Sequence, residues 1–387
     1  MAAHAKLSPS SAARWMTCTA SVALAEKYPN KDSGFAAEGT VYHQLVSDGL
    51  EFGFAPSASL GKIIVEGEHE VEVTEEMVAH AEEAIDHIED NIFKDGPRFV
   101  EERISLEPHM PGQFGTMDAG SYDDKTIFVH DEKYGAGVPV SPVENPQAML
   151  YALGFYNRIK HKTPAKEIVI SINQPRSKSG GGEWSLSTNE LVEFGEEVKR
   201  VVREIEEAPK FEPSPKACFF CPARKACEAY AEFCLHLMDN EFEDLDAMTP
   251  PKLPDKITPK RRSYVLTHAA MIKSWLRDLE DSALADAIED PSLTPGMKAV
   301  LGRAGPRRWG NTSDAEEGLR KLTSEEIFVK SLITPTAAEK LIGKKTFGKL
   351  ANLVQRSEPK PTLVSAKDNR PAYTAKGVSF DNLDEDF

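Results

Sequence analysis

The sequence predicts an α/β protein in which a mixed central β-sheet is flanked by helices and followed by a mostly helical C-terminal region. Two segments predict the sheet. Residues 115–133 read as paired strands around a polar turn, and the continuous apolar run over 167–175 is typical of a strand buried on both sides. Capped helix starts predict the flanking helices, most clearly Asn145 followed by Pro146. We therefore expect the sheet to lie within residues 1–235.

The composition is that of an ordinary globular protein. The 387 residues are 40% hydrophobic and 28% charged, and this length predicts two domains or one large domain with additions. No apolar run approaches the length of a membrane span, and the N-terminal segment lacks the apolar core of a signal peptide. We expect no membrane partner and a cytoplasmic location.

The charge is strongly acidic overall but uneven along the chain. A net charge of -16 argues against a protein covered in DNA-binding residues, although a local basic channel is still compatible with it. Between Lys298 and Leu350 there are eleven Lys and Arg residues against six Asp and Glu residues. Basic charge is therefore concentrated late in the chain.

Three helices are predicted before the first strand. Ser8, followed by a proline, is a good N-cap for the first helix. A second helix covers residues 35–50 and contains His43, and a lone helical histidine is more often a packed or surface residue than a ligand. A third helix, over residues 74–92, is acidic and amphipathic and leads to an alternating strand over 99–106.

The paired strands that follow predict a cluster of charges on one face of the sheet. With the turn centred on Asp124-Lys125, Asp118 and Asp131 stand directly opposite each other on antiparallel strands. Opposed residues project from the same face, and the two-residue period of a strand places Lys133 on that face as well. A three-residue loop would break the arrangement, because it would turn one strand over.

Two carboxylates and a lysine at one place suit phosphodiester hydrolysis. Mg²⁺ usually takes one or two protein carboxylates and completes its coordination with substrate phosphate and water. A lysine beside it orients the nucleophile or neutralises developing charge. An Asp-x-Lys triplet is common by itself, however, and the alternative interpretation is a surface hairpin with ordinary charges.

The helix that begins at Asn145-Pro146 adds two polar candidates. Gln147 and Tyr151 are four residues apart and therefore lie on one helical face. In the alternative interpretation, the helix packs its apolar side chains while Gln147 faces water. A further acidic helix is predicted over residues 189–205 after the buried strand.

The cysteines are few and clustered. Cys218, Cys221 and Cys227 form a C-x2-C-x5-C motif, which in a cytoplasmic chain indicates metal binding rather than disulfides. Either zinc or an iron–sulfur cluster needs a fourth ligand, for which Cys18 and Cys234 are the candidates. The alternative is that these cysteines are core residues.

Beyond the cysteines we expect three further regions. Residues 236–260 are acidic and then Pro-rich, as in a linker, and residues 261–355 are mostly helical. The basic run LGRAGPRRWGN is either a DNA-binding segment, which contacts phosphates and stacks on a base, or a β-hairpin with arginines on its surface. In the first case the candidate DNA-binding residues are Arg303, Arg307, Arg308 and Trp309. Residues 356–387 are expected to be a disordered tail with an acidic end.

Taken in order along the chain, these motifs resemble a nuclease family. The set His43, Gly115-x-x-Asp118, Asp131-x-Lys133, Gln147-x3-Tyr151 and C-x2-C-x5-C is similar to the PD-(D/E)xK nuclease superfamily. It looks most like the RecB-like branch that carries an iron–sulfur cluster, as in AddB and the CRISPR-associated exonucleases. The runs LSPSSAARW and KYGAGVPVSPVENPQAMLYALG resemble a phage- and prophage-borne family within that branch. The resemblance covers about residues 7–230, with weaker similarity through Trp309.

The resemblance implies a restriction-endonuclease-like core and a role for each motif. A Mg²⁺ or Mn²⁺ ion would be held by His43, Asp118 and Asp131, with the backbone carbonyl of Glu132 as an extra ligand. Lys133 would be the catalytic lysine, while Gln147 and Tyr151 would line the site and hold DNA or the lysine in place. A [4Fe-4S] cluster would be bound by Cys18, Cys218, Cys221 and Cys227, which leaves Cys234 spare.

The implied function is metal-dependent exonuclease activity on single-stranded DNA or DNA ends, in phage recombination or replication within the bacterial host cytoplasm. One alternative is a nucleic-acid-binding or scaffold protein that keeps this fold and cluster without useful catalysis. Another is a zinc-stabilised interaction protein. The acidic tail that ends in Phe387 resembles tails of phage and bacterial single-strand-binding proteins, and so implies docking of a replication or recombination protein.

Overall fold

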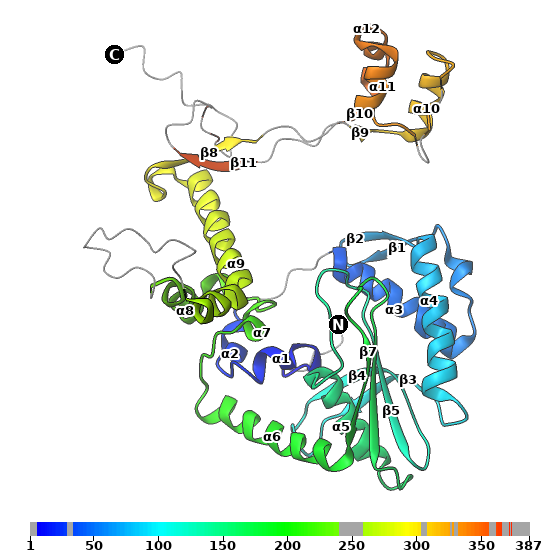
Figure 1. Cartoon of the computed structure of the whole chain (residues 1–387), viewed down its shortest axis with the longest axis vertical. Coiled ribbons are helices and arrows are strands. Elements are labelled where there is room, and N and C mark those ends of the chain that lie inside the picture. The colour runs from blue at the N-terminus through cyan, green and yellow to red at the C-terminus, as the bar shows by residue number, and fades with distance from the viewer. Residues whose placement is uncertain are drawn as a thin grey trace. The chain divides into compact units, whose positions relative to one another are not determined.

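The structure is a computed structural model, and the parts that it describes form two compact units. The described residues are 6–28, 34–239, 258–302, 308–325, 327–328, 332–355, 361–365, 371 and 373. The first unit comprises residues 1–272 and the second comprises residues 273–387. Each unit is described by itself below, with its elements labelled in Figure 1.

A five-stranded mixed sheet forms the centre of the first unit, which confirms the predicted fold class. Its strand order is β3-β4-β5-β6-β7, with β5 and β6 parallel and the other neighbours antiparallel. A parallel pair needs a crossover connection, which the helix between β5 and β6 supplies. The strands are β3 (Phe99–Ser105), β4 (Phe114–Tyr122), β5 (Thr126–Glu132), β6 (Glu167–Asn173) and β7 (Gly182–Ser187).

Helices cover both faces of this sheet (Figure 1). The alternation of β5 explains why: Phe128 packs with α3 (Gly34–Phe52) and α4 (Glu75–His87), while the two residues beside it, Ile127 and Val129, pack with α5 (Pro146–Ile159). On the second face, α6 (Thr188–Glu207) packs on α5. The expected Asn145 cap is present, because its side chain accepts from the Gln147 and Ala148 amides, whereas the side chain of Ser8 makes no cap hydrogen bond at the first helix. Thr74 caps α4 by accepting from the Met77 amide.

The N-terminal segment packs beside the region that contains the cysteines. The predicted first helix is a 3₁₀ turn, η1 (Pro9–Ser11), followed by α1 (Ala12–Trp15) and α2 (Ser21–Ala25). The Ala20 amide donates to the Lys210 carbonyl at 2.9 Å, and the Lys210 amide donates to Thr19 Oγ1 at 2.8 Å. Beyond this join lie α7 (Pro215–Cys218), η4 (Arg224–Ala226) and α8 (Glu228–Asp239).

Several elements of the first unit were not expected from the sequence. A hairpin of β1 (Ile63–Glu66) and β2 (His69–Glu72) follows η2 (Pro56–Ser59). The edge strand β7 lies between the predicted buried strand and the predicted helix over 189–205, where no strand was expected. The helix predicted over residues 74–92 is not α-helical throughout, because α4 ends at His87 and continues as a π-helix, η3 (Ile88–Phe93).

The second unit is mostly helical among its described residues, as predicted. Its helical elements are the end of α9 (Pro259–Glu289), η5 (Pro291–Leu293), α10 (Thr312–Arg320), α11 (Pro335–Ile342), α12 (Lys344–Phe347) and η6 (Gly348–Leu353). Two short antiparallel pairs accompany them: β8 (Met297–Leu301) with β11 (Pro361–Ser365), and β9 (Arg308–Trp309) with β10 (Val354–Gln355). The strands on either side of residues 303–307, which lie outside the described part, therefore pair with β11 and β10 rather than with each other.

Two of the C-terminal expectations fall mainly on residues outside the described part. Most of the expected linker lies in 240–257, and the acidic end of the tail lies beyond residue 373. Within the tail that was expected to be disordered, residues 361–365 form β11, since Leu363 and its neighbours pair with β8. Across the described residues no helix is long and apolar enough to span a membrane.

Candidate active site

The hairpin of β4 and β5 has the register that the sequence predicts. Ala119 pairs with His130 and Tyr122 pairs with Ile127, so one step further along the ladder Asp118 stands opposite Asp131. The Glu132 amide donates to Asp118 Oδ2 at 2.7 Å, which fixes this carboxylate to the neighbouring strand. Asp118 and Asp131 are thus held at the end of β5 that is remote from the turn.

Lys133 and two polar residues of α5 surround the Asp131 carboxylate. Lys133 Nζ lies 2.5 Å from Asp131 Oδ2, and the side chain of Asp131 is only 3% exposed while that of Lys133 is 25% exposed. Gln147 Nε2 donates to Asp131 Oδ1 at 3.1 Å and lies 3.2 Å from the Tyr151 hydroxyl. Gln147 therefore does not simply face water, and both predicted α5 residues join the cluster.

The two carboxyl groups have opposite pKa shifts because their neighbours differ. Burial raises the pKa of Asp131, and the nearby Asp118 charge adds to this despite the opposing effect of Lys133. Burial also disfavours the Asp118 charge, but His43 and Lys133 outweigh it and lower the pKa of Asp118. Likewise burial opposes the Lys133 charge, while the Asp131 carboxylate outweighs it and raises the pKa of Lys133.

His43 reaches the same place from α3. Its Nδ1 lies 3.5 Å from Asp118 Oδ2, so the histidine that the sequence left ambiguous belongs to the cluster. Burial alone would lower the pKa of His43, but the adjacent Asp118 carboxylate raises it to about 9. An imidazole and a carboxylate held together in this way can share a cation.

Glu101 is a site residue that the sequence reasoning missed. Ligand atoms of His43, Glu101 and Asp118 all lie within 4.8 Å of one another. Glu101 lies across from Asp118 in the β3–β4 register and has a φ of 46°, a left-handed value that is uncommon for a residue other than glycine. Loss of solvent and the Asp118 charge raise the pKa of Glu101 to about 7. Only the pairing of β3 with β4 could have identified it.

The Glu132 side chain points to the opposite face of β5 from Asp131 and is buried in a polar network. Its carboxylate accepts from the Tyr42 hydroxyl at 2.9 Å and from Asn173 Nδ2 at 3.0 Å, and it lies 2.6 Å from His130 Nε2. Tyr42 precedes His43 on α3, so this network fastens α3 to β5 beside the site. The carboxylate of Glu132 therefore has a structural role, and only the backbone carbonyl of this residue remains a candidate ligand for the metal ion.

Gly115 allows the walls of the site to approach closely. An ideal Cβ placed on this residue would lie 2.6 Å from Tyr151 Cε1 and 2.7 Å from Pro9 Cγ. Both distances are far below van der Waals contact, and neither neighbour is the free end of a flexible side chain. Gly115 is thus required for the packing of Tyr151 against η1.

We expect Gly115→Ala to displace Tyr151 or Pro9 and to cost about 1–3 kcal/mol of stability, as overpacking does. A change at Tyr151 also disturbs Gln147, so DNA cleavage should fall more than the fraction folded. Gly135→Ala is the matched control, since a Cβ there meets nothing within 4 Å. Chemical denaturation and cleavage rates compare the two variants, and equal behaviour would contradict the assigned role of Gly115.

Four of the five cysteines line one small cavity. Cys18 from the N-terminal segment meets Cys218, Cys221 and Cys227 there, as the motif resemblance implied. Burial raises the pKa of Cys218 to about 12, and the charges of the neighbouring thiols contribute in the same direction. Cys234 is buried elsewhere and interacts with Tyr230, so it is not among the residues that line this cavity.

The candidate DNA-binding residues of the second unit are described only in part. Arg303 and Arg307 lie outside the described residues, and for Arg308 only the backbone in β9 is described. Trp309 Nε1 donates to the Ile333 carbonyl at 2.7 Å, and its ring packs near Phe347. The indole therefore belongs to the small core of this unit, and base stacking by Trp309 stays a prediction.

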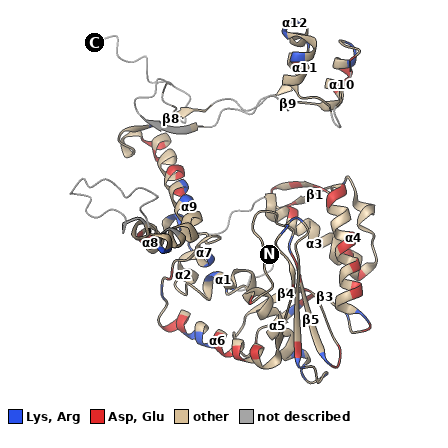
Figure 2. Ribbon diagram, viewed as in Figure 1, with Lys and Arg blue, Asp and Glu red and all other residues tan. Residues whose placement is uncertain are grey.

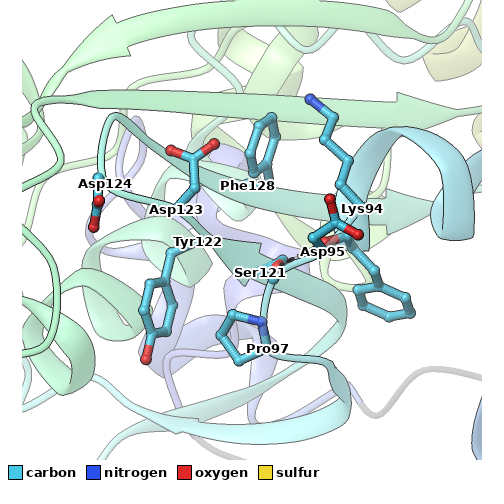
Figure 3. Close-up of a pocket in the computed structure, with 10 residues that line it drawn as sticks. Lys94, Asp95, Pro97, Ser121, Tyr122, Asp123, Asp124 and Phe128 are labelled. Carbon is cyan, nitrogen blue, oxygen red and sulfur yellow. Dashed lines mark hydrogen bonds between the residues drawn. The ribbon is translucent and has the colours of Figure 1, made fainter.

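A separate hollow of about 430 Å³ lies at the turn end of β5 (Figure 3). Lys94 lies there with its ammonium group 4.3 Å from the centre of the Phe128 ring. Asp123 Oδ1 accepts from the Lys125 and Thr126 amides, so its carboxylate builds the turn. The predicted catalytic residues lie at the opposite end of β5, away from this hollow.

Comparison with known proteins identifies a family, and the matching solved structures include one of low structural similarity. A family model described as "Protein of unknown function (DUF2800)" matches residues 4–371. A solved structure entitled "Crystal structure of SSO0001" is 15% identical, and the match covers 54% of this chain and 94% of that one with a TM-score of 0.22. At that score the likeness carries no argument about fold or function.

Proposed function

We propose that this chain, which belongs to the DUF2800 family, is a divalent-metal-dependent deoxyribonuclease. One observation carries the proposal: His43 on α3 and Asp118 on β4 meet beside the Asp131–Lys133 pair at the end of β5. A cation site next to a partly exposed lysine is an arrangement that phosphodiester hydrolysis uses.

The donor atoms fit Mg²⁺ or Mn²⁺. His43, Glu101 and Asp118 already have ligand atoms within 4.8 Å of one another, and Asp131 lies on the same face. Carboxylate oxygens suit hard cations, and the imidazole is a donor that transition ions accept readily, so we expect Mn²⁺ to serve at least as well as Mg²⁺. When bound, the cation would act as a Lewis acid toward the scissile phosphate.

The chain's own residues supply positioning and charge. Lys133 is partly exposed and points its ammonium group at the cluster, where it can neutralise charge that develops on the phosphate. Gln147 holds Asp131 and contacts Tyr151, so these two residues orient the carboxylate from the α5 side. Asp118 is held by the Glu132 amide, which keeps its oxygens directed at His43.

We propose that the four cysteines that line this small cavity bind a [4Fe-4S] cluster, as the motif resemblance implies, with a zinc ion as the alternative. A bound cluster would join the two ends of the nuclease core.

The finer proposal is an exonuclease that acts on single strands or DNA ends in phage recombination or replication. It rests on the motif resemblance given above. A replication or recombination protein that docks on the acidic tail belongs to the same proposal, although the tail end lies outside the described residues. The competing function is a DNA-binding or scaffold protein that retains the fold and the cluster without catalysis.

Linear and circular single-stranded DNA distinguish the modes of cleavage. With Mn²⁺, anaerobically purified protein should degrade the linear strand and leave the circle of identical sequence intact, because an exonuclease needs an end. Both substrates should survive in EDTA. Cleavage of the circle would contradict the exonuclease mode, and survival of both substrates in Mn²⁺ would favour the binding protein.

A further inference from the structure

A second hollow, of about 360 Å³, lies between the N-terminal segment and α7. Its cationic residues are Lys6, Arg14 and Lys216, and its one carboxylate is Glu26. Lys6 Nζ pairs with Glu26 Oε1 at 2.8 Å, which leaves Arg14 and Lys216 as the uncompensated charges of the lining. Acidic side chains run along α4 and α6 elsewhere in this unit (Figure 2), so a cationic hollow is notable in a chain of net charge -16.

Aromatic rings and hydroxyl groups complete the lining. Phe220 is 73% exposed and Tyr28 is 39% exposed, and both border the hollow. Phe220 belongs to the short loop between Cys218 and Cys221, and its ring packs edge-on against Phe219 with the ring centres 4.6 Å apart. The hydroxyl groups come from three serines of the N-terminal segment, Ser8, Ser10 and Ser11. Cations with exposed aromatic rings are the combination that binds backbone phosphates and stacks unpaired bases.

The hollow shares a wall with the candidate active site. The serines belong to the turn that begins at Ser8, and Pro9 of the same turn packs against Gly115 and Tyr151. The Leu7 amide also donates to Gln113 Oε1 at 2.9 Å, which ties this turn to the start of β4. A chain that lies along the hollow would therefore reach Tyr151 on the other side of η1.

We propose that this hollow binds single-stranded DNA and delivers the strand to the active site. The proposal rests on the nuclease function above and adds a substrate-binding site to it. Arg14 and Lys216 contact phosphates, and Phe220 stacks on a base next to them. In this proposal the cysteine site also contributes to DNA binding, because loss of its bound group would release the loop that carries Phe220.

Fluorescence anisotropy with fluorescein-labelled oligothymidine, measured in EDTA with the cluster intact, tests binding apart from catalysis. The double variant Phe220→Ala with Lys216→Ala should bind about tenfold or more weakly, as expected for one stacked base and one phosphate contact. Its plot of log affinity against log salt should be shallower by about 0.7. The matched control is Phe54→Ala with Lys62→Ala, which removes an exposed phenylalanine and an exposed lysine of the same unit that line neither the hollow nor the cysteine cavity.

The outcomes separate this proposal from the nuclease function. If the test variant binds as tightly as the control variant, or if the wild type does not bind oligothymidine, the hollow is not the DNA site. If the test variant alone loses binding while the wild type fails to cut DNA in Mn²⁺, the hollow stands and the nuclease function fails.

Discussion

Lys133→Ala is expected to lower the rate of DNA cleavage by about a hundredfold to a thousandfold, the usual cost of removing one group that stabilises transition-state charge. The lysine contacts Asp131 at 2.5 Å and has no place in the apolar cores around it. The fold should survive, because Gln147 still donates to Asp131. Cleavage of end-labelled single-stranded DNA in Mn²⁺ measures the loss, and circular dichroism checks the fold.

Lys125→Ala is the matched control for this prediction. Lys125 is exposed at the turn end of the same hairpin, so its loss changes the net charge equally but leaves the cluster untouched. Cleavage by this variant should match the wild type. An active Lys133→Ala enzyme would overturn the site assignment.

Cys18→Ala should remove the brown colour that the proposed cluster would give and lower the melting temperature by about 10 °C or more, because binding free energy of a structural metal group is folding free energy. Cys18 is the proposed ligand that would join the N-terminal segment to the region of residues 210–227, where the Glu212 amide already donates to its sulfur at 3.4 Å. Absorbance in the violet region and thermal unfolding measure the two effects.

Cys234→Ala provides the control for the cluster. It removes a buried thiol outside the four-cysteine cavity, so the colour should persist and stability should fall only by the small cost of a cavity. A Cys18→Ala protein that remains brown, or a Cys234→Ala protein that loses its colour, would contradict the ligand assignment. A colourless wild type that contains zinc would support the zinc-stabilised alternative.

The sequence predicted the hairpin site well because local rules determine it. A strand has a period of two, and a turn centred on Asp124-Lys125 places Asp118 opposite Asp131 in any antiparallel pair. The Asn145 cap and the four-residue spacing of Gln147 and Tyr151 likewise depend on a single helix. These features needed no knowledge of the rest of the fold.

Features that depend on distant segments were not predicted. Glu101 joins the cluster through the β3–β4 register and an unusual local φ, neither of which a run of charged residues reveals. The buried network of Tyr42, Glu132 and Asn173 connects three elements, α3, β5 and β6, and no sequence periodicity predicts it. The short hairpin β1–β2 was missed because each strand has only four residues, the apolar residues of β1 are consecutive rather than alternating, and only Val71 of the pair is buried.

The most direct test of the nuclease function compares wild type with Asp131→Ala on end-labelled single- and double-stranded DNA in Mn²⁺. Asp131 is nearly buried, touches Lys133 and Gln147, and lies opposite Asp118. We predict that the wild type releases label and that Asp131→Ala, with its cluster intact, does not. If both proteins release label equally, or if neither cuts any substrate while the cluster is intact, the proposed active site is wrong.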